Sequence, residues 1–431
     1  MPPSDSVNWM REASRFIRAH RQKTFVVYLG GELLQSDGID ECVEDLILLA
    51  GLGIKLVLVH GARPQIDATC REAGVDSAFV NDLRITNSEV FDNVKRAVVT
   101  TRITLEAKLT RAALDTVERK AAMTIVGGTF VIARPKGIVA GKDMGLAGEI
   151  RRIDAPAINH ALADGSIVLL SSLAYSSSGE AFNMNALEMA AVVAGELHAD
   201  KLVMFAEGSV EKSDGQGLLR QLTLNQARDL ELDNSTMARY LACAVRACQQ
   251  GVHRAHIISR HISGALVEEL FTRDGCGTLI SDAPFDRLRA ATIDDIGGIL
   301  ALIEPLEAAG ILVKRSREKL EMEIDHYQVM VREGTVVACG ALHQFNDGTA
   351  AEVACIAVHP DYRERDFGRV MVSSLEERAK QMGVTQTFVL TTDASQWFEE
   401  QGYVRTSIEA LPVERQQLYN YQRNSVVLSK G

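Results

Sequence analysis

A strand, a charged loop and a helix follow one another between Ala350 and Val372, with the sequence AAEVACIAVHPDYRERDFGRVMV. Glu352 lies on the apolar strand, where a carboxylate can take a proton from a reacting group. The tight turn after the strand contains Arg363 and Gly368, and it leads into a helix whose first backbone N–H groups converge. A helix start of this kind binds phosphate or pyrophosphate groups. The segment therefore predicts acid–base chemistry beside a bound pyrophosphate.

This segment resembles the acetyl-coenzyme A binding strand, loop and helix of GNAT N-acetyltransferases, and the resemblance extends over residues 288–431. It implies that Glu352 is the general base; the alternative is a solvent-facing strand residue. The usual loop is Arg/Gln-x-x-Gly-x-Gly/Ala, whereas Asp366 replaces the first glycine in this chain. The resemblance also implies two sets of coenzyme contacts. The backbone of one set pairs with the pantetheine arm: Cys355, Ile356, Ala357 and Val358. The other set holds the pyrophosphate: Arg363, Glu364, Arg365, Asp366, Phe367, Gly368 and Arg369.

Thr391 begins a second informative segment, TTDASQWFEEQGY at 391–403. Many GNAT enzymes have a tyrosine that protonates the leaving thiolate where this chain has Phe398, which has no proton to give. The resemblance makes the hydroxyl of Thr391 the candidate for stabilising the thiolate. Cys355 is a possible acyl carrier, but a direct transfer needs none, and the alternative is a small buried residue.

Two patterns of elements surround these residues. Before residue 280, apolar strands such as Phe25–Leu29 alternate with helices such as Asp40–Ala50. Thr86 and Glu89 have the spacing of a capping box that opens a long helix. This alternation predicts a three-layer αβα unit with a largely parallel sheet, and the antiparallel strands after residue 288 predict an α+β unit.

The predicted organisation has four parts: an N-terminal helix at 1–21, a first domain at 22–280, a turn-rich linker at 281–287 and a second domain at 288–431. The helix is amphipathic, with Trp9, Phe16 and Ile17 on one face. It either packs on its own unit or bridges subunits.

The first domain resembles the amino acid kinase fold, and within it acetylglutamate kinase, over residues 24–280. The matching motifs keep their order: YLGG at 28–31, VHGARPQID at 59–67, LRITNSE at 83–89, NMNALE at 183–188 and ELFTRDGCGT at 269–278. Tyr28 and Arg239 stand where active kinases have phosphate-contacting lysines, and Leu187 stands where they have an aspartate. Because phosphoryl transfer depends on positioning and charge neutralisation, these departures imply a unit without kinase chemistry. As a further alternative, the unit only holds an oligomer together.

A second set of matches points to regulation. Lys201, His256, Glu269 and Gly275 fall where arginine-sensitive acetylglutamate kinases bind L-arginine. A carboxylate such as Glu269 suits a guanidinium or amino group. Taken without the resemblance, Glu269 would be a solvated helix residue. Two other residues, Arg84 and Asn183, match positions that hold acetylglutamate in the kinases, and whether they bind a ligand in this chain is left open.

A kinase-like unit without its chemistry, followed by a GNAT unit, resembles the family of bacterial N-acetylglutamate synthases. The run LYNYQRNSVVL at 418–428 resembles that family in particular. The resemblance implies transfer of acetyl from acetyl-coenzyme A to the α-amino group of L-glutamate, the first step of arginine biosynthesis, with feedback regulation by L-arginine. It also implies a homo-oligomer, a hexamer in that family.

Glutamate carries two carboxylates, so its pocket must offer cations and hydroxyls. The resemblance nominates Arg315, Arg423 and Ser425. We expect Arg423 and Ser425 to alternate on one face of a C-terminal strand, from which both reach one ligand. A solvated helix start is the alternative for Arg315.

Composition excludes several other classes. The chain has 431 residues, a formal net charge of -11 and 46% hydrophobic residues, which describes an acidic globular protein of two or three domains. The negative charge argues against a nucleic-acid surface. The seven cysteines are scattered without a Cys-x-x-Cys pair, so disulfides and structural zinc are not expected. We expect a reducing, cytoplasmic compartment. Neither a signal peptide, a membrane span nor a metal site is expected.

Two other functions stay open from the residues. An active acetylglutamate kinase is opposed by Tyr28, Leu187 and Arg239. A non-catalytic arginine sensor with a degenerate GNAT unit is suggested by Asp366.

Overall fold

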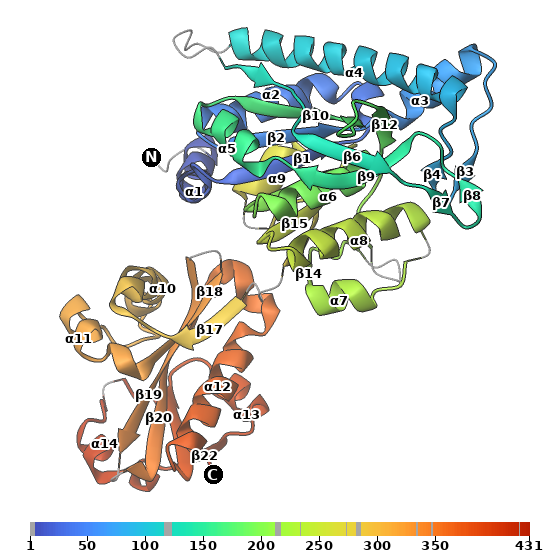
Figure 1. Ribbon diagram of the computed structural model, residues 1–431. Coiled ribbons are helices and arrows are strands. Elements are labelled where there is room, and N and C mark those ends of the chain that lie inside the picture. Colours follow the sequence, from blue (N-terminus) through green and yellow to red (C-terminus); the bar gives the residue numbers. More distant parts are fainter. Residues whose placement is uncertain are drawn as a thin grey trace. The chain divides into compact units, whose positions relative to one another are not determined.

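The computed structural model describes residues 5–115, 123–211, 217–232, 234–272, 274–281, 286–332, 335–345, 348–421 and 423–431. The chain forms two compact units, residues 1–283 and 284–431 (Figure 1). Most of the linker expected at 281–287 lies outside the described residues.

The N-terminal unit is built on an eight-stranded sheet with the order β14-β16-β15-β13-β1-β2-β10-β5. All neighbouring strands run parallel except β15 and β16. The strands are β1 (Thr24–Leu29), β2 (Lys55–His60), β5 (Ile125–Val126), β10 (Ile167–Ser171), β13 (Lys201–Ala206), β14 (Gln221–Thr223), β15 (Arg254–Ser259) and β16 (Thr278–Ser281).

Successive side chains of the central strand β1 enter two different cores. Val26 and Tyr28 belong to the core on one face of the sheet, and Phe25 and Val27 belong to the core on the other. The first face is covered by α5 (Ala155–Ala163), α6 (Ala186–Glu196) and α8 (Ser235–Gln249). The second is covered by α1 (Asp5–His20), α2 (Ile39–Gly51), α4 (Ser88–Asp115) and α9 (Ala265–Phe271). A strand buried on both faces needs a continuous apolar run, which TFVVYL provides, and the predicted three-layer αβα fold is confirmed.

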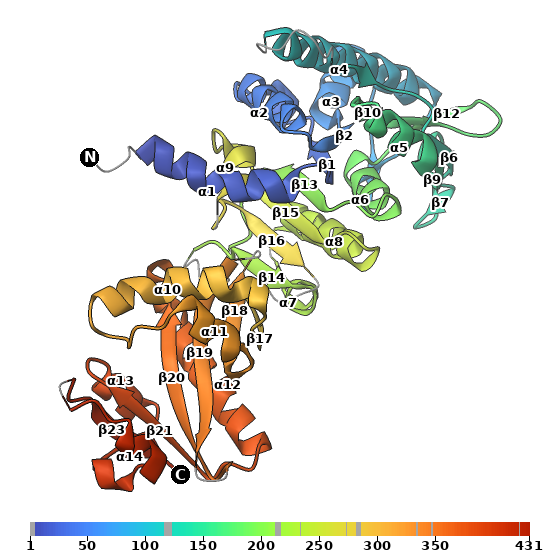
Figure 2. The same ribbon diagram turned by 90° about the vertical axis from the view of Figure 1, so that its left-hand side faces the viewer.

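Short elements complete this unit. A small closed sheet consists of β6 (Val131–Pro135), β9 (Ala147–Ile153), β11 (Leu173–Tyr175) and β12 (Ala181–Met184). The remaining elements are η1 (Leu33–Gln35), α3 (Arg63–Glu72), β3 (Phe79–Val80), β4 (Leu83–Arg84), β7 (Ile138–Val139), β8 (Lys142–Asp143) and α7 (Leu224–Asp229). Figure 2 shows α1 lying beside α9, with which it is in contact.

The expected capping box at the start of α4 is wrong. Asn87 caps this helix, because its Oδ1 accepts the backbone N–H of Val90 at 2.8 Å. The Thr86 hydroxyl instead donates to the carbonyl of Arg84 and accepts the amide of Asn183, both at 3.1 Å. A tertiary partner on β12 thus takes the side chain that the local pattern assigned to the helix.

The C-terminal unit has a seven-stranded sheet with the order β17-β18-β19-β20-β21-β23-β22. Its strands are β17 (Asp286–Ala290), β18 (Tyr327–Arg332), β19 (Thr335–Phe345), β20 (Ala350–Val358), β21 (Gln386–Thr391), β22 (Val404–Thr406) and β23 (Val426–Lys430). One face packs on α10 (Ile296–Ala308) and α11 (Arg317–Met322), and the other packs on α12 (Phe367–Gln381). Five shorter helices complete the unit: η2 (Ile293–Asp295), η3 (Ile324–His326), η5 (Pro360–Arg365), α13 (Ser395–Glu400) and α14 (Val413–Gln417), with a further turn η6 (Ile408–Ala410).

The strands β20 and β21 run parallel and pair only at their first residues, from Ala350 with Gln386 to Glu352 with Phe388. A β-bulge in β20 accompanies their separation, because Cys355 and Ile356 together oppose Gly340 of β19. Cys355 has a φ of 55°. A bulge of this kind bends the strand and increases its twist. Within the described part of the sheet, the backbone of 353–358 therefore has no strand partner on the β21 side.

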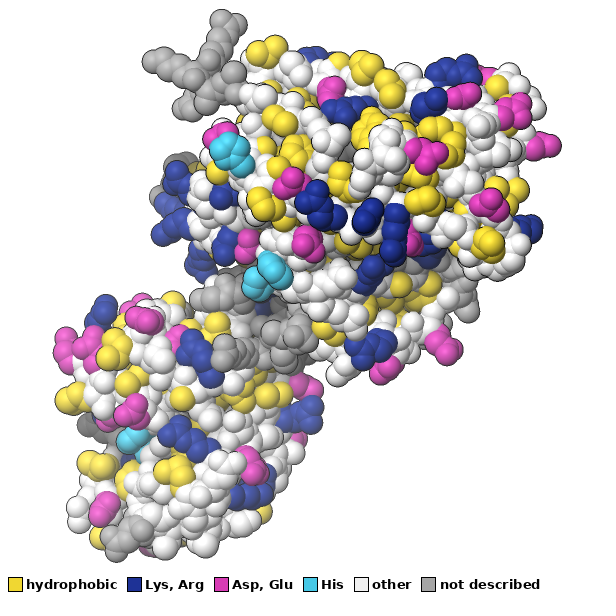
Figure 3. Space-filling model, viewed as in Figure 1, with side chains coloured by type: hydrophobic (Ala, Val, Ile, Leu, Met, Phe, Trp, Pro, Cys, Tyr) yellow, Lys and Arg dark blue, Asp and Glu magenta, His cyan; other side chains and the backbone are white. Residues whose placement is uncertain are grey.

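Charged side chains of both signs are interspersed over the face of the molecule shown in Figure 3. None of the described helices combines the length and the apolar character that crossing a membrane requires.

Candidate active site and effector site

Glu352 lies at the point where β20 and β21 stop pairing. Its side chain is 13% exposed and makes an ion pair with Arg415 of α14. Arg415 donates from Nε to Oε2 at 2.6 Å and from Nη2 to Oε1 at 3.2 Å, so it binds both carboxylate oxygens. The sequence reasoning missed Arg415, which stands in the polar run PVERQQL with no pattern to distinguish it. Any ammonium group that approaches Glu352 must share the carboxylate with this guanidinium.

Thr391 is the last residue of β21, on the other side of the separation between the strands. Its Oγ1 accepts the backbone N–H groups of Asp393 at 3.3 Å and Ala394 at 3.0 Å. Since those two bonds occupy the acceptor side of the oxygen, the hydroxyl hydrogen remains for donation. Phe398 is buried, and its ring contacts those of Trp397 and Tyr403 edge-on, as expected for a core residue.

Cys355 is buried against Cys339 and Tyr327 in an apolar cluster. The Cys339 thiol points to the carbonyl of Cys355 at 3.8 Å. This environment is that of a packed residue, and the neighbouring residues Ile356, Ala357 and Val358 continue β20 towards the loop.

The loop after β20 forms the helix η5 and then turns into α12. The turn residue is Asp366, with a φ of 56°, and not Gly368 as the sequence suggested. Gly368 lies inside the first turn of α12, where an added Cβ would be 3.1 Å from Cζ2 of Trp397. Its glycine character therefore serves close packing rather than the turn.

The start of α12 presents free backbone donors. The first intrahelical bond runs from the N–H of Val370 to the carbonyl of Asp366 at 3.0 Å. The preceding N–H groups, those of Phe367, Gly368 and Arg369, therefore have no partner within the helix and point out of its end. Arg363 is exposed nearby, and Arg369 pairs with Asp366 at 2.9 Å. The side chains of Glu364 and Arg365 lie outside the described residues.

Arg315 and Arg423 lie close to each other. Burial, and next the charge of Arg315, lowers the pKa of Arg423. The Arg423 guanidinium donates to the carbonyls of Gly310 and Ile311, and that of Arg315 donates to the carbonyl of Val313 at 2.9 Å. Two neighbouring guanidinium groups favour an anion between or beside them.

The expectation that Arg423 and Ser425 share a strand face is wrong. Strand β23 begins only at Val426. Arg423 and Ser425 therefore lie before the strand, on either side of Asn424, which has a φ of 47°. The carbonyl of Ser425 accepts the hydroxyl of Tyr419 at 2.7 Å. The turn, and not strand alternation, determines where these two side chains lie.

The N-terminal unit contains a pocket of about 160 Å³ lined by Tyr28, Arg84, Asn183, Leu187 and Arg239 together with other residues. Burial raises the pKa of Tyr28 well above its usual value, so its phenol is neutral. A Cβ added to Gly61 would lie 3.1 Å from the Tyr28 hydroxyl, which therefore occupies the space beside this glycine turn.

Two arginines of this pocket are paired with carboxylates. Arg239 pairs with Asp82, and Arg84 pairs with Asp67 at 2.5 Å. Where active kinases have two phosphate-contacting lysines, this chain has a phenol and a paired guanidinium, and a leucine stands in place of their aspartate.

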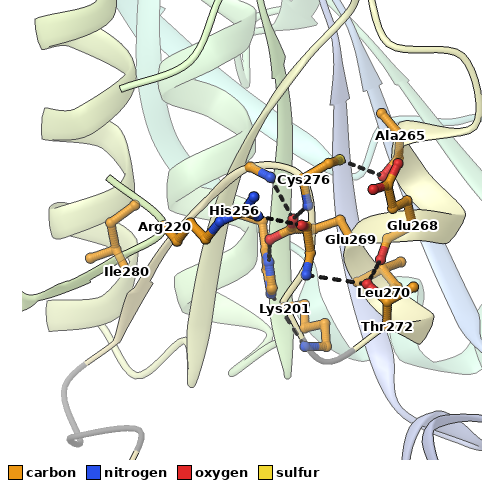
Figure 4. Close-up of polar contacts among 12 residues, drawn as sticks. Lys201, Arg220, His256, Ala265, Glu268, Glu269, Leu270, Thr272, Cys276 and Ile280 are labelled. Carbon is orange, nitrogen blue, oxygen red and sulfur yellow. Dashed lines mark hydrogen bonds and ion pairs between the residues drawn. The ribbon is translucent and has the colours of Figure 1, made fainter. Parts of the chain in front are cut away.

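Lys201 and His256 lie around Glu269, as Figure 4 shows. The fourth predicted effector residue, Gly275, lies beside the Glu269 carboxylate. Glu269 Oε1 lies 2.7 Å from Nδ1 of His256, and Nε2 of His256 lies 3.2 Å from Nζ of Lys201. Glu269 Oε2 accepts the backbone N–H groups of Cys276 at 2.9 Å and Gly277 at 2.8 Å. All three side chains are buried, which opposes the earlier alternative of a solvated Glu269.

The electrostatics of this cluster centre on one carboxylate. Burial, followed by the charge of Lys201, lowers the pKa of His256 to about 4, so the imidazole is neutral near neutral pH. Burial opposes the ionisation of Glu269, but its hydrogen bond with His256 and the two amide donors outweigh that effect and lower its pKa. Lys201 and Glu269 therefore form a buried ionic system connected through a neutral histidine.

Two further residues, which sequence reasoning missed, lie at the border of this effector cluster. Arg220 donates to the carbonyl of Gly275 at 2.6 Å. His20, at the end of α1, lies 2.9 Å from the carbonyl of Leu270 on α9 through its Nε2. The second contact links the N-terminal helix to the helix that carries Glu269.

The described residues contain no group of three or more His, Cys, Asp or Glu side chains that could hold a metal ion. All seven cysteines are free thiols.

Comparisons with known proteins give two family matches. Residues 23–259 match the model of the Amino acid kinase family, and residues 302–403 match that of the Acetyltransferase (GNAT) family. The amino-acid acetyltransferase of Pseudomonas aeruginosa is 44% identical over 430 residues, and that of Azotobacter vinelandii is 46% identical over 431 residues. Each alignment covers 99% of both chains.

Two crystal structures of N-acetylglutamate synthase from Neisseria gonorrhoeae are also similar, at 34% identity and 99% coverage of both chains. The TM-score is 0.90 for the complex with coenzyme A and L-arginine. It is 0.63 for the complex with coenzyme A and N-acetyl-glutamate.

Proposed function

Because the chain belongs to the amino-acid acetyltransferase family, we propose that it transfers the acetyl group of acetyl-coenzyme A to the α-amino group of L-glutamate. The observation that carries this proposal is the position of Glu352 and Thr391 on either side of the separation between β20 and β21. An acid–base carboxylate and a free hydroxyl hydrogen thus border the stretch of β20 that has no strand partner.

Acetyl-coenzyme A is assigned to this separation. Its pantetheine arm can pair with the free backbone groups of 353–358 in the manner of an added strand. Its pyrophosphate then meets the N–H groups at the start of α12, supported by Arg363 and Arg369. Asp366 adds a negative charge at the same place, which Arg369 partly neutralises at 2.9 Å.

In the proposed reaction, Glu352 takes a proton from the α-ammonium group of glutamate, and the neutral amine attacks the thioester carbonyl. The C–N bond forms and the C–S bond breaks. The nitrogen gives up a second proton, which the departing sulfur takes up, and the Thr391 hydroxyl stabilises the thiolate before it is protonated. No covalent enzyme intermediate is needed, which agrees with the buried, packed state of Cys355. Arg415 orients the Glu352 carboxylate before the substrate arrives.

The two carboxylates of glutamate require two cationic contacts. Arg315 and Arg423 offer neighbouring guanidinium groups, and Ser425 offers a hydroxyl next to them. An acceptor with one carboxylate would leave one of these cations without an anion, and this favours glutamate over neutral amino acids.

We also propose feedback control by L-arginine through the cluster of Lys201, His256, Glu269 and Gly275. The guanidinium or the amino group of the effector can bind Glu269, whose carboxylate already makes three contacts in a buried site. The contact between His20 and Leu270 gives α1 a direct link to that site. In this assignment residues 22–280 are the regulatory unit and residues 288–431 are the catalytic unit, joined by a linker at 281–287.

We further propose a cytoplasmic homo-oligomer, a hexamer as the family resemblance implies. Apolar side chains exposed on the N-terminal unit support association of this unit. Trp9 and Met10 of α1 are 46% and 57% exposed, and Ile103 of α4 is 60% exposed. Apolar side chains gathered on exposed helices favour subunit contacts.

Thiol release from acetyl-coenzyme A with L-glutamate as acceptor tests these assignments. We expect glutamate-dependent release that L-arginine lowers, loss of release in Glu352→Gln, and unchanged release in Glu414→Gln, a matched control on the exposed side of α14. Release with another amine but not with glutamate would overturn the substrate assignment. Release that arginine does not change would leave the N-terminal unit as a scaffold, and hydrolysis of ATP with N-acetylglutamate would restore the kinase alternative.

A further inference from the structure

Two histidines lie beside the proposed base and have no role in the reaction described above. His343 of β19 is the direct cross-strand partner of Glu352 in the antiparallel pair β19–β20. Directly opposed residues of such a pair project from the same face of the sheet, with Cβ atoms about 5 Å apart. His326, at the end of η3, meets His343 with an Nδ1-to-Nδ1 distance of 2.8 Å. The two imidazoles therefore extend from the neighbourhood of Glu352 towards η3.

The short distance between the two Nδ1 atoms defines their protonation. A hydrogen bond between two ring nitrogens needs one N–H donor and one bare acceptor. One proton therefore lies between the rings, and moving it from one nitrogen to the other needs little displacement of either ring. The rings are also held in place, because they meet edge-on with centroids 4.8 Å apart. Arg378 of α12 fixes the end of η3 by donating to the carbonyl of Asp325 at 2.7 Å.

The surroundings of His343 keep its imidazole in the neutral form. Burial, and next the charge of His326, lowers its pKa, and Arg315 acts in the same direction. Glu352 and Glu323 act in the opposite direction, and the ring of Tyr327 lies edge-on at 6.5 Å. His343 is therefore neutral near neutral pH. His326 is exposed, so the far end of the pair reaches solvent.

The stoichiometry of the reaction requires such an exit. An α-ammonium group brings three protons: one stays on the amide nitrogen, one completes the coenzyme A thiol, and one must leave the site. Glu352 receives this last proton and has to lose it before the next turnover. Since Arg415 and Arg315 are cationic, they cannot accept it. The two imidazoles are neighbouring groups that can accept it.

We propose that His343 and His326 form the path by which the proton taken up by Glu352 reaches solvent. The proton passes from the Glu352 carboxylate to His343, the proton between the two Nδ1 atoms shifts to His326, and His326 releases a proton to water. No bond other than N–H and O–H bonds changes. The transfer leaves each imidazole in its other neutral tautomer, and exchange of ring protons with water restores the starting tautomers. The histidines act through Glu352 and do not touch the substrate. This inference rests on the proposed role of Glu352.

The test compares His343→Asn and His326→Asn with the parent protein. Asparagine keeps an amide close to the position of Nδ1, so the hydrogen bond can persist, but an amide cannot pass a proton on. For His343→Asn we expect kcat near pH 7 to fall about tenfold, less than the ~10²-fold contribution of a direct acid–base group. The KM values for glutamate and acetyl-coenzyme A should not change. The loss should shrink towards about pH 9, where more glutamate arrives as the free amine.

Small buffers give a second readout that a merely structural role would not produce. Imidazole in the assay should restore part of the kcat of both variants, because it can accept the proton in place of the missing ring. His160→Asn, which changes an exposed histidine of α5, is the control and should be insensitive to imidazole.

Three results separate the possible failures. Parental kcat and pH profile in both histidine variants, together with an inactive Glu352→Gln, would overturn the proton path and leave the base in place. A loss that is equal at every pH and unaffected by imidazole would assign the pair to packing and also overturn the path. An active Glu352→Gln would instead refute the proposed base. If His343→Asn is unstable, the exposed His326→Asn still decides the matter.

Discussion

Replacing Gly275 with alanine should separate two effects that meet at the effector cluster. Gly275 has a φ of +60°, and a Cβ added to it would lie 2.3 Å from Oε2 of Glu269. Gly264, which precedes α9, has a φ of +68° and nothing within 4 Å of an added Cβ. Gly264→Ala therefore measures the free-energy cost of the left-handed backbone alone. Gly275→Ala measures the same cost together with that of a clash against Glu269.

The magnitudes follow from these contacts. A non-glycine residue in the left-handed region costs about 1 kcal/mol relative to glycine. The clash must also push the Glu269 carboxylate away from the N–H groups of Cys276 and Gly277, and a hydrogen bond to a charged group contributes about 1.5–3 kcal/mol. With one of these bonds lost, we expect Gly275→Ala to lower the free energy of unfolding by about 3 kcal/mol and Gly264→Ala to lower it by about 1 kcal/mol.

Urea unfolding of the full chain measures both values. The chain has two tryptophans, Trp9 in the N-terminal unit and Trp397 in the C-terminal unit, so a Trp397→Phe background leaves Trp9 as the reporter of the N-terminal unit. The arginine response of thiol release should weaken in Gly275→Ala and persist in Gly264→Ala. Equal urea midpoints for the two variants would refute the reasoning, because they would mean that the loop does not hold the Glu269 carboxylate.

Three further outcomes are expected. Thr391→Val removes the hydroxyl proposed to stabilise the departing thiolate, which also accepts the amides of Asp393 and Ala394, so kcat should fall about 10²-fold. Thr391→Ser should keep most activity. A valine variant with the parental kcat would exclude Thr391 as the group that stabilises the thiolate. Asp366→Gly removes a negative charge from the start of α12 and relieves a φ of 56°, so the KM for acetyl-coenzyme A should fall about threefold. Asp366→Asn should lower this KM as well. A rise in KM for both variants would contradict a pyrophosphate at this position. Burial, and next the Lys201 charge, lower the pKa of His256 from 6.5 to about 4, so the unfolded chain binds more protons than the folded one between these pH values. The urea midpoint should therefore decline as the pH falls from about 6.5 to about 4. A constant midpoint would show that His256 is not buried in its neutral form.

The three-layer fold of the N-terminal unit could be predicted because its signals are local. The run TFVVYL is apolar at every position, and the helices that follow it carry their own periodicity. The cap of α4 could not be predicted from the same pattern. Thr86 has the residue type and spacing of a cap, but its hydroxyl bonds to Asn183, which is 97 positions away in the chain. Residue spacing shows which hydrogen bonds a side chain could make, and tertiary contacts determine which of them it makes.

The candidate active site shows the same division. The family resemblance nominated Glu352 and Thr391, but nothing in the sequence points to Arg415, because an arginine in a short polar helix has the same appearance whether it is solvated or paired. The strand expected for Arg423 and Ser425 fails because Asn424 takes a left-handed backbone and the chain turns. Gly368 does not make the turn, because Asp366, two residues earlier, takes the left-handed backbone, and the glycine instead leaves room for Trp397.

The ion pair between Glu352 and Arg415 joins residues 63 positions apart. In the effector cluster, Lys201 contacts His256 across 55 positions, and Glu269 contacts His256, Cys276 and Gly277 within 13 positions. Closing the larger loop costs more chain entropy, although the cost rises only slowly with length. During synthesis, where the chain emerges from its N-terminus, the effector cluster can be complete while Arg415 and Arg423 are still inside the ribosome. In the proposed assignment, a nascent chain would bind arginine at this cluster before its catalytic unit is complete.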